Sequence, residues 1–224
     1  MAISHYLACS NYPLAKMVET QGLRYSYSSD KEFSFPDLHC EKGESLLIHG
    51  KSGIGKTTLG KLMIGLLEPL EGTVSIDHKN LNSLSAAKKD AFRAQHIGFI
   101  PQQAHFIPSL NVQEHFDLLQ QWTGKVDQDR IHAILQKLNL ISALATSPFA
   151  LSGGQQQRLS TALALFHHPS VVLADEPTSQ LDDGHAQSVA ELLMTTCQEL
   201  DSALVIISHD SRLKPLCNRK IELI

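Results

Sequence analysis

Residues 50–58 combine three glycines, two lysines and two threonines at a spacing suited to holding phosphate groups. Glycines allow left-handed backbone conformations, so that consecutive N–H groups can point at a polyphosphate. We expect Lys56 to reach the β- and γ-phosphates, Thr57 to ligate Mg²⁺ and Thr58 to hold the α-phosphate. An ordinary glycine turn with a solvated lysine is the alternative. The stretch consists of Gly50, Lys51, Ser52, Gly53, Ile54, Gly55, Lys56, Thr57 and Thr58.

A strand before the loop and a helix after it are needed to position such a stretch. Residues 45–49 form a short apolar run typical of a buried strand. After the loop, apolar residues recur at helical spacing, and Pro69 is expected to stop the helix. These apolar residues are Leu59, Leu62, Met63, Leu66 and Leu67.

A second candidate anion site lies about a hundred residues further on, in residues 151–158. Ser152 can cap a helix that continues over residues 159–166, while Gly153 and Gly154 expose N–H groups at its positive end. Gln155 follows them. An ordinary helix cap is the alternative interpretation.

Polar side chains follow three apolar runs that read as strands. Residues 171–174 lead to Asp175 and Glu176, residues 203–207 lead to Ser208 and His209, and residues 97–100 lead to Gln102. Ligands bind outside the carboxyl ends of strands in α/β sheets. Adjacent carboxylates point to opposite sides of an extended chain, so one can hold Mg²⁺ through water while the other acts as general base. A lone histidine at a strand end is usually structural.

The chain before the phosphate loop reads as antiparallel strands, with residues 18–27 loosely alternating. We expect Tyr27 to stack on an adenine, the alternative being an exposed position on the sheet. Residues 83–95 predict a polar helix. Residues 104–150 carry two helical patterns, 112–122 and 131–140, and no strand, which indicates a small helical subdomain inserted into an α/β core.

Composition limits the classes of protein. The 224 residues are 42% hydrophobic and 19% charged, which favours one globular domain with a subdomain. A net charge of −4 gives no general attraction to nucleic acid or anionic lipid, so we expect no nucleic-acid partner. The four scattered cysteines are typical of a reducing compartment.

No apolar run approaches the ~20 residues of a membrane span, so a soluble chain is expected. Residues 1–16 are expected to be a tail, or to precede a true start at Met17.

Together these motifs resemble the nucleotide-binding subunit of an ATP-binding cassette (ABC) transporter, over residues 17–224. Residues 50–57 resemble the family's Walker A, residues 171–176 its Walker B with a catalytic glutamate, and residues 151–158 its signature. The resemblance implies a P-loop NTPase core with an antiparallel β subdomain and an inserted helical subdomain at about 104–160. It also implies a Mg²⁺-dependent ATPase, in which Gln102 senses Mg²⁺ and the attacking water, His209 is the switch histidine, and residues 179–182, including Asp182, cross a dimer interface.

The resemblance further implies how such a chain works with others. Two chains, identical or paralogous, would enclose two ATP molecules head to tail, with Ser152, Gly153 and Gly154 acting in trans. A separate integral membrane permease subunit would receive the mechanical output. The chain is therefore expected in the cytoplasm, peripheral on the inner face of the cell membrane.

Residues 173–178, the short length and residues 107–112 look similar to lipoprotein-releasing and macrolide-exporting ATPases. The main alternative is a force-transmitting relative that regulates a membrane partner without moving a solute. A soluble switch on nucleic acid or ribosomes is disfavoured, because the sequence has neither a long coiled-coil insertion nor a second cassette. Gln180 stands where relatives often carry Asn or Ala, which leaves coupling across the interface open.

Overall fold

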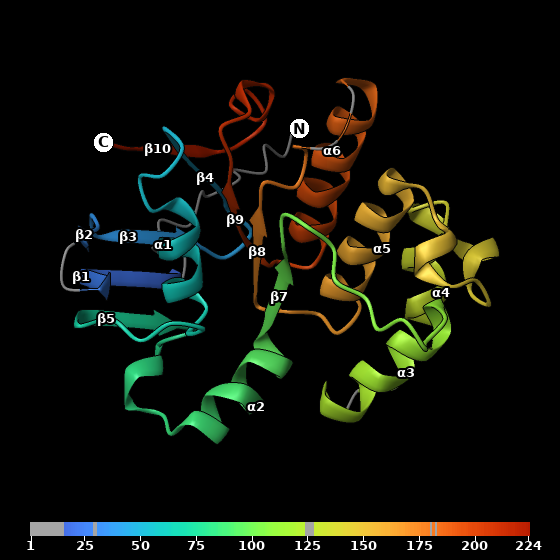
Figure 1. The fold of residues 1–224 in the computed structure, drawn as a ribbon, viewed down its shortest axis with the longest axis horizontal. Coiled ribbons are helices and arrows are strands. Elements are labelled where there is room, and N and C mark those ends of the chain that lie inside the picture. The colour runs from blue at the N-terminus through green and yellow to red at the C-terminus, as the bar shows by residue number, and fades with distance from the viewer. Residues whose placement is uncertain (1–15, 29–30, 124–127, 180, 182) are drawn as a thin grey trace, which may run out of the picture.

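The protein is built around two sheets, seen in a computed structural model that describes residues 16–28, 31–123, 128–179, 181 and 183–224 (Figure 1). Each sheet has five strands, and in the first sheet all four strand pairs are parallel. In spatial order its strands are β10 (Arg219–Leu223), β4 (Ser45–Gly50), β9 (Ala203–Ile207), β8 (Val171–Asp175) and β7 (Ile97–Ile100). The sequence predicted four of them but not β10, an edge strand of mixed polarity.

The central strands are apolar on both faces because each face packs on its own hydrophobic cluster. In β4, Leu47 belongs to the cluster on one side, while Leu46 and Ile48 belong to the cluster on the other. The same alternation holds in β8 and β9. Burial on both faces explains why these strands read as continuous apolar runs.

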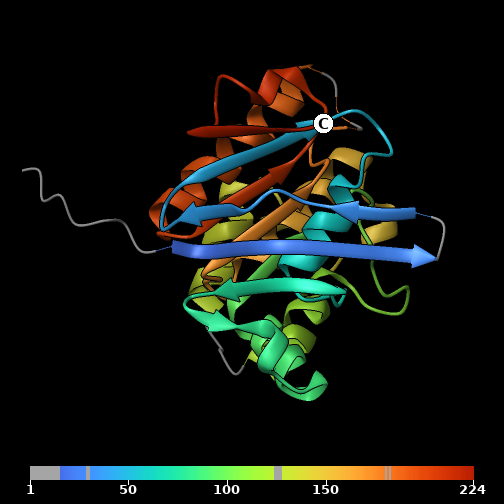
Figure 2. The ribbon, with the colours of Figure 1, turned by 90° about the vertical axis from the view of Figure 1, so that its left-hand side faces the viewer.

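The second sheet is antiparallel and covers one side of the core (Figure 2). Its path is β2-β1-β5-β6, with β3 paired to β1. The strands are β1 (Lys16–Ser28), β2 (Lys31–Ser34), β3 (Leu38–Glu41), β5 (Glu71–Ile76) and β6 (Lys79–Asn80). The predicted tail covers residues 1–16. Residues 1–15 lie outside the described residues, and Lys16 is the first residue of β1.

Helices complete the layers. The helix α1 (Lys56–Met63) packs between the two sheets, whereas α5 (Gly153–Leu165) and α6 (Asp183–Glu199) lie on the opposite side of the parallel sheet (Figure 1). Beyond α5 lie α3 (Val112–Thr123) and α4 (Gln128–Lys137), and α2 (Ala86–His96) leads into β7. Short 3₁₀ turns occur at Leu81–Ser83, Ile141–Ala143, Pro148–Ala150 and Ser211–Leu213.

The expected end of the first helix was wrong. The α1 helix ends at Met63 rather than near Pro69, because Gly65 takes a left-handed conformation (φ 67°). The Gly65 N–H donates to Leu62 O at 2.9 Å, and the Leu66 N–H donates to Lys61 O at 2.8 Å. This pair of bonds is the Schellman motif that closes many helices.

None of the helices in the described part of the chain combines the length and apolar content needed to cross a bilayer.

Candidate active site

The phosphate loop connects the end of β4 to the start of α1, as the sequence predicted. Gly53 and Gly55 have φ values of 79° and 103°, in the left-handed region that favours glycine. A Cβ on Gly55 would also lie 2.8 Å from Cδ1 of Phe33. An L side chain therefore cannot replace Gly55 without displacing the loop or the aromatic ring.

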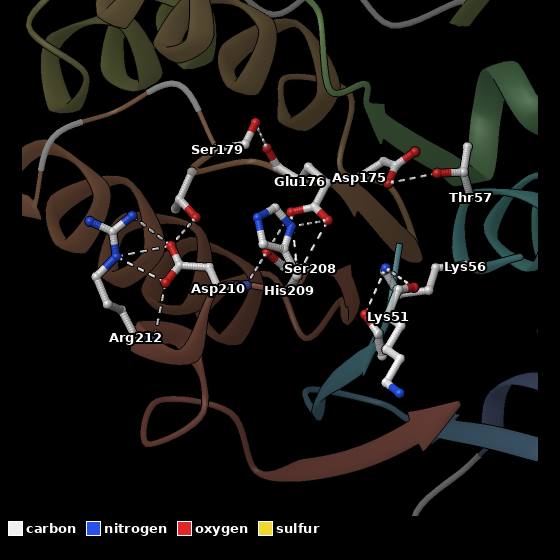
Figure 3. A network of polar contacts seen from close by, with 12 residues as sticks. Lys51, Lys56, Thr57, Asp175, Glu176, Ser179, Ser208, His209, Asp210 and Arg212 are labelled. Atoms are coloured by element: carbon white, nitrogen blue, oxygen red, sulfur yellow. Dashed lines mark hydrogen bonds and ion pairs between the residues drawn. The ribbon is translucent and has the colours of Figure 1, made fainter. Parts of the chain in front are cut away.

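Lys56 is buried at the first position of α1. Its Nζ donates hydrogen bonds to Gly50 O at 2.9 Å and to Lys51 O at 3.0 Å (Figure 3). The first turn of α1 contains no acidic residue, so the positive end of the helix dipole is not neutralised locally. The loop, the helix end and the ammonium together form an anion site.

Asp175 ends β8 and faces the start of α1. The Thr57 hydroxyl donates to Asp175 Oδ1 at 3.3 Å (Figure 3). Burial is the largest influence on this carboxyl and raises its pKa above the ordinary value, although the bond from Thr57 acts in the opposite direction. A hydroxyl and a desolvated carboxylate are hard oxygen donors of the kind that Mg²⁺ prefers.

Glu176 departs from the extended conformation that the sequence suggested. Its φ is 50°, in the left-handed region, so the expected alternation of two carboxylates along a strand does not apply. Its carboxylate turns toward the end of β9 and accepts a bond from the Ser208 hydroxyl at 2.7 Å. The His209 N–H donates to Glu176 Oε1 at 3.2 Å, and His209 Nδ1 lies 2.8 Å from the same oxygen (Figure 3).

One cleft of about 510 Å³ brings the candidate residues together. Gln102, Glu176 and His209 line it together with most of the phosphate loop, including Lys56 and Thr57. The remaining loop residues in the lining are Gly50, Lys51, Ser52, Gly53, Gly55 and Thr58. The anion site and the candidate general base therefore share one cavity.

Phe33 lies in the described lining of this cleft, a position that the sequence did not predict for it. Its ring stacks on Phe35, with centroids 6.0 Å apart. Tyr27 is 59% exposed, and its hydroxyl lies 3.2 Å from the Thr58 hydroxyl. The stacking role of Tyr27 thus stays a prediction, at a position beside the cleft.

The second predicted anion site lies at the start of α5. Ser152 caps the helix by accepting a bond from the Gln155 N–H at 3.3 Å, and the Gln155 side chain accepts from the Ser152 N–H at 2.9 Å. Among the described residues, the lining of the cleft includes none of Ser152, Gly153, Gly154 and Gln155. Asp182 lies outside the described residues.

An apolar groove of about 460 Å³ runs beside the cleft, between β7 and the helices α3 and α5. Its lining includes Phe106, Ile107 and Trp122, and Trp122 is 61% exposed. Pro101, the neighbour of Gln102, also lines it. Two successive residues of the segment after β7 therefore line the groove and the cleft, respectively.

Comparison with known proteins gives consistent matches. A family model described as ABC transporter matches residues 35–179. The chain is 34% identical over 207 residues to the lipoprotein-releasing system ATP-binding protein LolD of Oleidesulfovibrio alaskensis, covering 90% of each chain. The uncharacterized ABC transporter ATP-binding protein YbbA of Escherichia coli is 32% identical over 219 residues, covering 95% of this chain and 96% of YbbA. HrtA of Staphylococcus epidermidis, whose name assigns it to hemin import, is 38% identical over 190 residues, covering 84% of this chain and 85% of HrtA.

Solved structures show the same fold. The ATP-binding cassette MJ0796, a dimer in a post-hydrolysis state bound to ADP and Pi, matches with a TM-score of 0.84 and 30% identity, covering 92% of this chain and 94% of its own. The chain cbiO1 of Clostridium perfringens, part of the ABC transporter complex cbiONQ, matches with a TM-score of 0.79 and 25% identity, covering 93% of this chain and 84% of its own.

Proposed function

Because the chain belongs to the ABC transporter family of ATP-hydrolysing subunits, we propose that it powers a separate integral membrane subunit that releases or exports lipoproteins. The family resemblance and the fold class expected from the sequence are confirmed by the matches to ABC cassettes. ATP is the substrate of this family of ATPases.

The observation that carries the catalytic part of the proposal is the cleft that gathers the phosphate loop, Gln102, Glu176 and His209. Lys56 and the N-terminus of α1 would hold the phosphates. The Glu176 carboxylate would accept a proton from a water as that water's oxygen attacks the γ-phosphorus, and the bond to the β-phosphate oxygen would break to give ADP and phosphate. His209 and Gln102 would orient the water and the γ-phosphate.

The oxygen donors beside the loop fit a magnesium ion. Thr57, Asp175 and Gln102 would hold it, and when bound it would neutralise charge on the phosphates. Within the described ranges, no group of three or more His, Cys, Asp or Glu side chains is arranged to hold a metal ion. A site completed by phosphate oxygens and water agrees with the way Mg²⁺ binds nucleotides.

A second chain would complete each site. Ser152, Gly153, Gly154 and Gln155 form a capped helix start that is absent from the described lining of the cleft, and they would bind an anion there. In a head-to-tail dimer, of identical or paralogous chains, they would close over the nucleotide of the partner. The dimeric state of MJ0796 supports this arrangement.

The apolar groove beside Gln102 would receive a cytoplasmic segment of the membrane subunit. Exposed Ile107 and Trp122 give it apolar contact area, and Pro101 connects it to the catalytic cleft. Such docking would place the chain in the cytoplasm, on the inner face of the membrane. Nucleotide-dependent movement of the segment after β7 would then reach the membrane subunit directly.

Lipoproteins are the proposed cargo because several similar relatives are named for lipoprotein release. The test begins with a tagged chain recovered from detergent-solubilised membranes of its source, to identify the membrane subunit. Reconstitution of that pair in proteoliposomes should give ATP-dependent release of a lipoprotein. A pair that hydrolyses ATP but moves no lipoprotein would favour the force-transmitting alternative or another cargo such as hemin.

The catalytic assignment has a separate test in Glu176→Gln. This variant should bind ATP and accumulate as a dimer, because the general base is lost while the phosphate loop is intact. Size-exclusion chromatography with and without ATP measures this. A variant that hydrolyses ATP at the wild-type rate would remove Glu176 from the proposed role.

A further inference from the structure

Two loops that follow neighbouring strands are joined behind the catalytic cleft. We propose that Thr178 and Asp210 are positioning residues that hold Glu176 and His209 in their working geometry by tying these loops together. This inference rests on the catalytic roles proposed above for Glu176 and His209. Thr178 and Asp210 themselves are absent from the described lining of the cleft, so they would act through their neighbours.

The direct link is a hydrogen bond from a buried donor to a partly buried acceptor. The Thr178 hydroxyl donates to Asp210 Oδ2 at 2.7 Å, and Thr178 has no solvent exposure. Thr178 lies two residues after Glu176, and Asp210 is the residue after His209. The bond therefore fixes the distance between the two loops immediately beyond their functional side chains.

A second path runs from Asp210 to the catalytic carboxylate. The Asp210 N–H donates to Ser208 Oγ at 3.0 Å, and Ser208 in turn donates its hydroxyl to Glu176 Oε2 at 2.7 Å (Figure 3). Ser208 is fully buried. A shift of Asp210 would thus change the support of the Glu176 side chain as well as the position of His209.

Arg212 holds Asp210 in place. Its Nη2 donates to Asp210 Oδ2 at 2.7 Å and its Nε to Oδ1 at 2.9 Å (Figure 3). The hydrogen bonds from Arg212 lower the pKa of Asp210 to about 2, although partial burial acts in the opposite direction. Asp210 is therefore an ionised acceptor at neutral pH, which strengthens the bond from Thr178.

The backbone of Glu176 explains why such support is needed. A glutamate with φ of 50° occupies an unfavourable region, and such residues persist only when the surrounding contacts determine their conformation. The Glu176 N–H donates to Ile207 O at 2.7 Å, which anchors the backbone on β9. The Ser208 hydroxyl supports the Glu176 side chain directly, and Thr178 acts on it through Asp210 and Ser208.

A purely structural role for Asp210 is the competing explanation, because its side chain also caps the 3₁₀ turn Ser211–Leu213 by accepting from the Arg212 N–H at 2.9 Å. Thr178→Val separates the two, since it removes the hydroxyl at nearly constant volume and leaves the Asp210 bonds to Arg212 in place. Thr178→Ser restores the hydroxyl. Thr20→Val is a matched control, because Thr20 is equally buried and its hydroxyl accepts one bond, from the Leu38 N–H at 3.0 Å, in the antiparallel sheet.

The experiment measures steady-state ATP hydrolysis by the full chain, with thermal unfolding in parallel. For Thr178→Val we expect kcat to fall about tenfold with KM for ATP within about twofold of wild type, because the reacting groups lose alignment while the phosphate loop is intact. Thr178→Ser should recover most of the rate, and Thr20→Val should keep the wild-type rate. If Thr178→Val does not fold, Thr178→Ala is compared with Thr178→Ser, a pair that differs only in the hydroxyl.

Three results would overturn the inference: a wild-type kcat in Thr178→Val, an equal loss in Thr178→Ser, or a loss of rate matched by a rise in KM. Glu176→Gln is assayed alongside. If Glu176→Gln is inactive and Thr178→Val is normal, only the positioning role fails. If Glu176→Gln is itself normal, the proposed catalytic function fails.

Discussion

Replacing Gly98 by alanine should destabilise the protein, because a methyl group has no room where β7 meets α5. A Cβ on Gly98 would lie 2.3 Å from the carbonyl oxygen of Ala164 and 3.1 Å from Cγ of Pro169. Carbon and oxygen atoms in contact are normally about 3.3 Å apart, so helix and strand would have to separate by about 1 Å. The obstacle is backbone, which cannot rotate away as a side chain could.

The expected magnitude combines two opposing effects. Forcing an extra methyl group into a packed core costs about 1–3 kcal/mol. Replacing glycine by alanine within a strand normally stabilises the folded state by about 0.5–1 kcal/mol, because alanine loses less backbone entropy on folding. With the middle of each range, the free energy of unfolding should fall by about 1 kcal/mol, and Tm by about 2–4 °C for a domain of this size.

Scanning calorimetry of wild type and Gly98→Ala measures this change. Gly153→Ala is the matched control for stability, because nothing lies within 4 Å of the Cβ that it would add at the start of α5. Its Tm should stay the same or rise slightly. A Tm for Gly98→Ala equal to or above that of wild type would refute the argument from close packing.

Three further predictions follow from the site and the core. Lys56→Ala should abolish ATP binding in calorimetric titration, since the buried ammonium is lost; retained affinity would contradict the phosphate-loop assignment. Asp175→Asn should raise Tm of the ligand-free protein at pH 7 and weaken stabilisation by MgATP. Burial raises the pKa of Asp175 above its unfolded value of 3.8, so its ionisation lowers stability as pH rises through the folded pKa; an unchanged or lower Tm would refute this sign. Cys197 and Cys217 should resist alkylation until unfolding, because burial raises the pKa of their thiols to about 12 and about 11; mass spectrometry of the native protein would detect any early labelling.

Much of the site could be predicted because its residues sit at the ends of strongly patterned elements. The apolar runs before Asp175 and His209 form β8 and β9, and both strands deliver polar side chains at their carboxyl ends. Ser152 and Gln155 form the reciprocal cap whose residue types are visible in the sequence. These features depend on local spacing, which a sequence displays.

Other features depend on contacts between distant segments. The Glu176 backbone is in the left-handed region because hydrogen bonds to Ile207 and from Ser208 hold it there, and a glutamate side chain does not favour that conformation by itself. Phe33 reaches the cleft through the packing of the antiparallel sheet on the phosphate loop. The bond between Thr178 and Asp210 joins residues 32 positions apart. The edge strand β10 lacks the continuous apolar pattern of a central strand, because its side chains alternate between contact and exposure.

The contacts of Lys56 affect the entropy of binding a polyphosphate. A free lysine side chain gives up about 2 kcal/mol of rotamer entropy when it is immobilised. Here the ammonium donates to Gly50 O and Lys51 O within its own loop, so these contacts order the side chain as the loop folds. An arriving polyphosphate only has to replace carbonyl acceptors with its own oxygens. A polyphosphate that binds this loop would therefore not have to supply the entropy of immobilising a mobile cation.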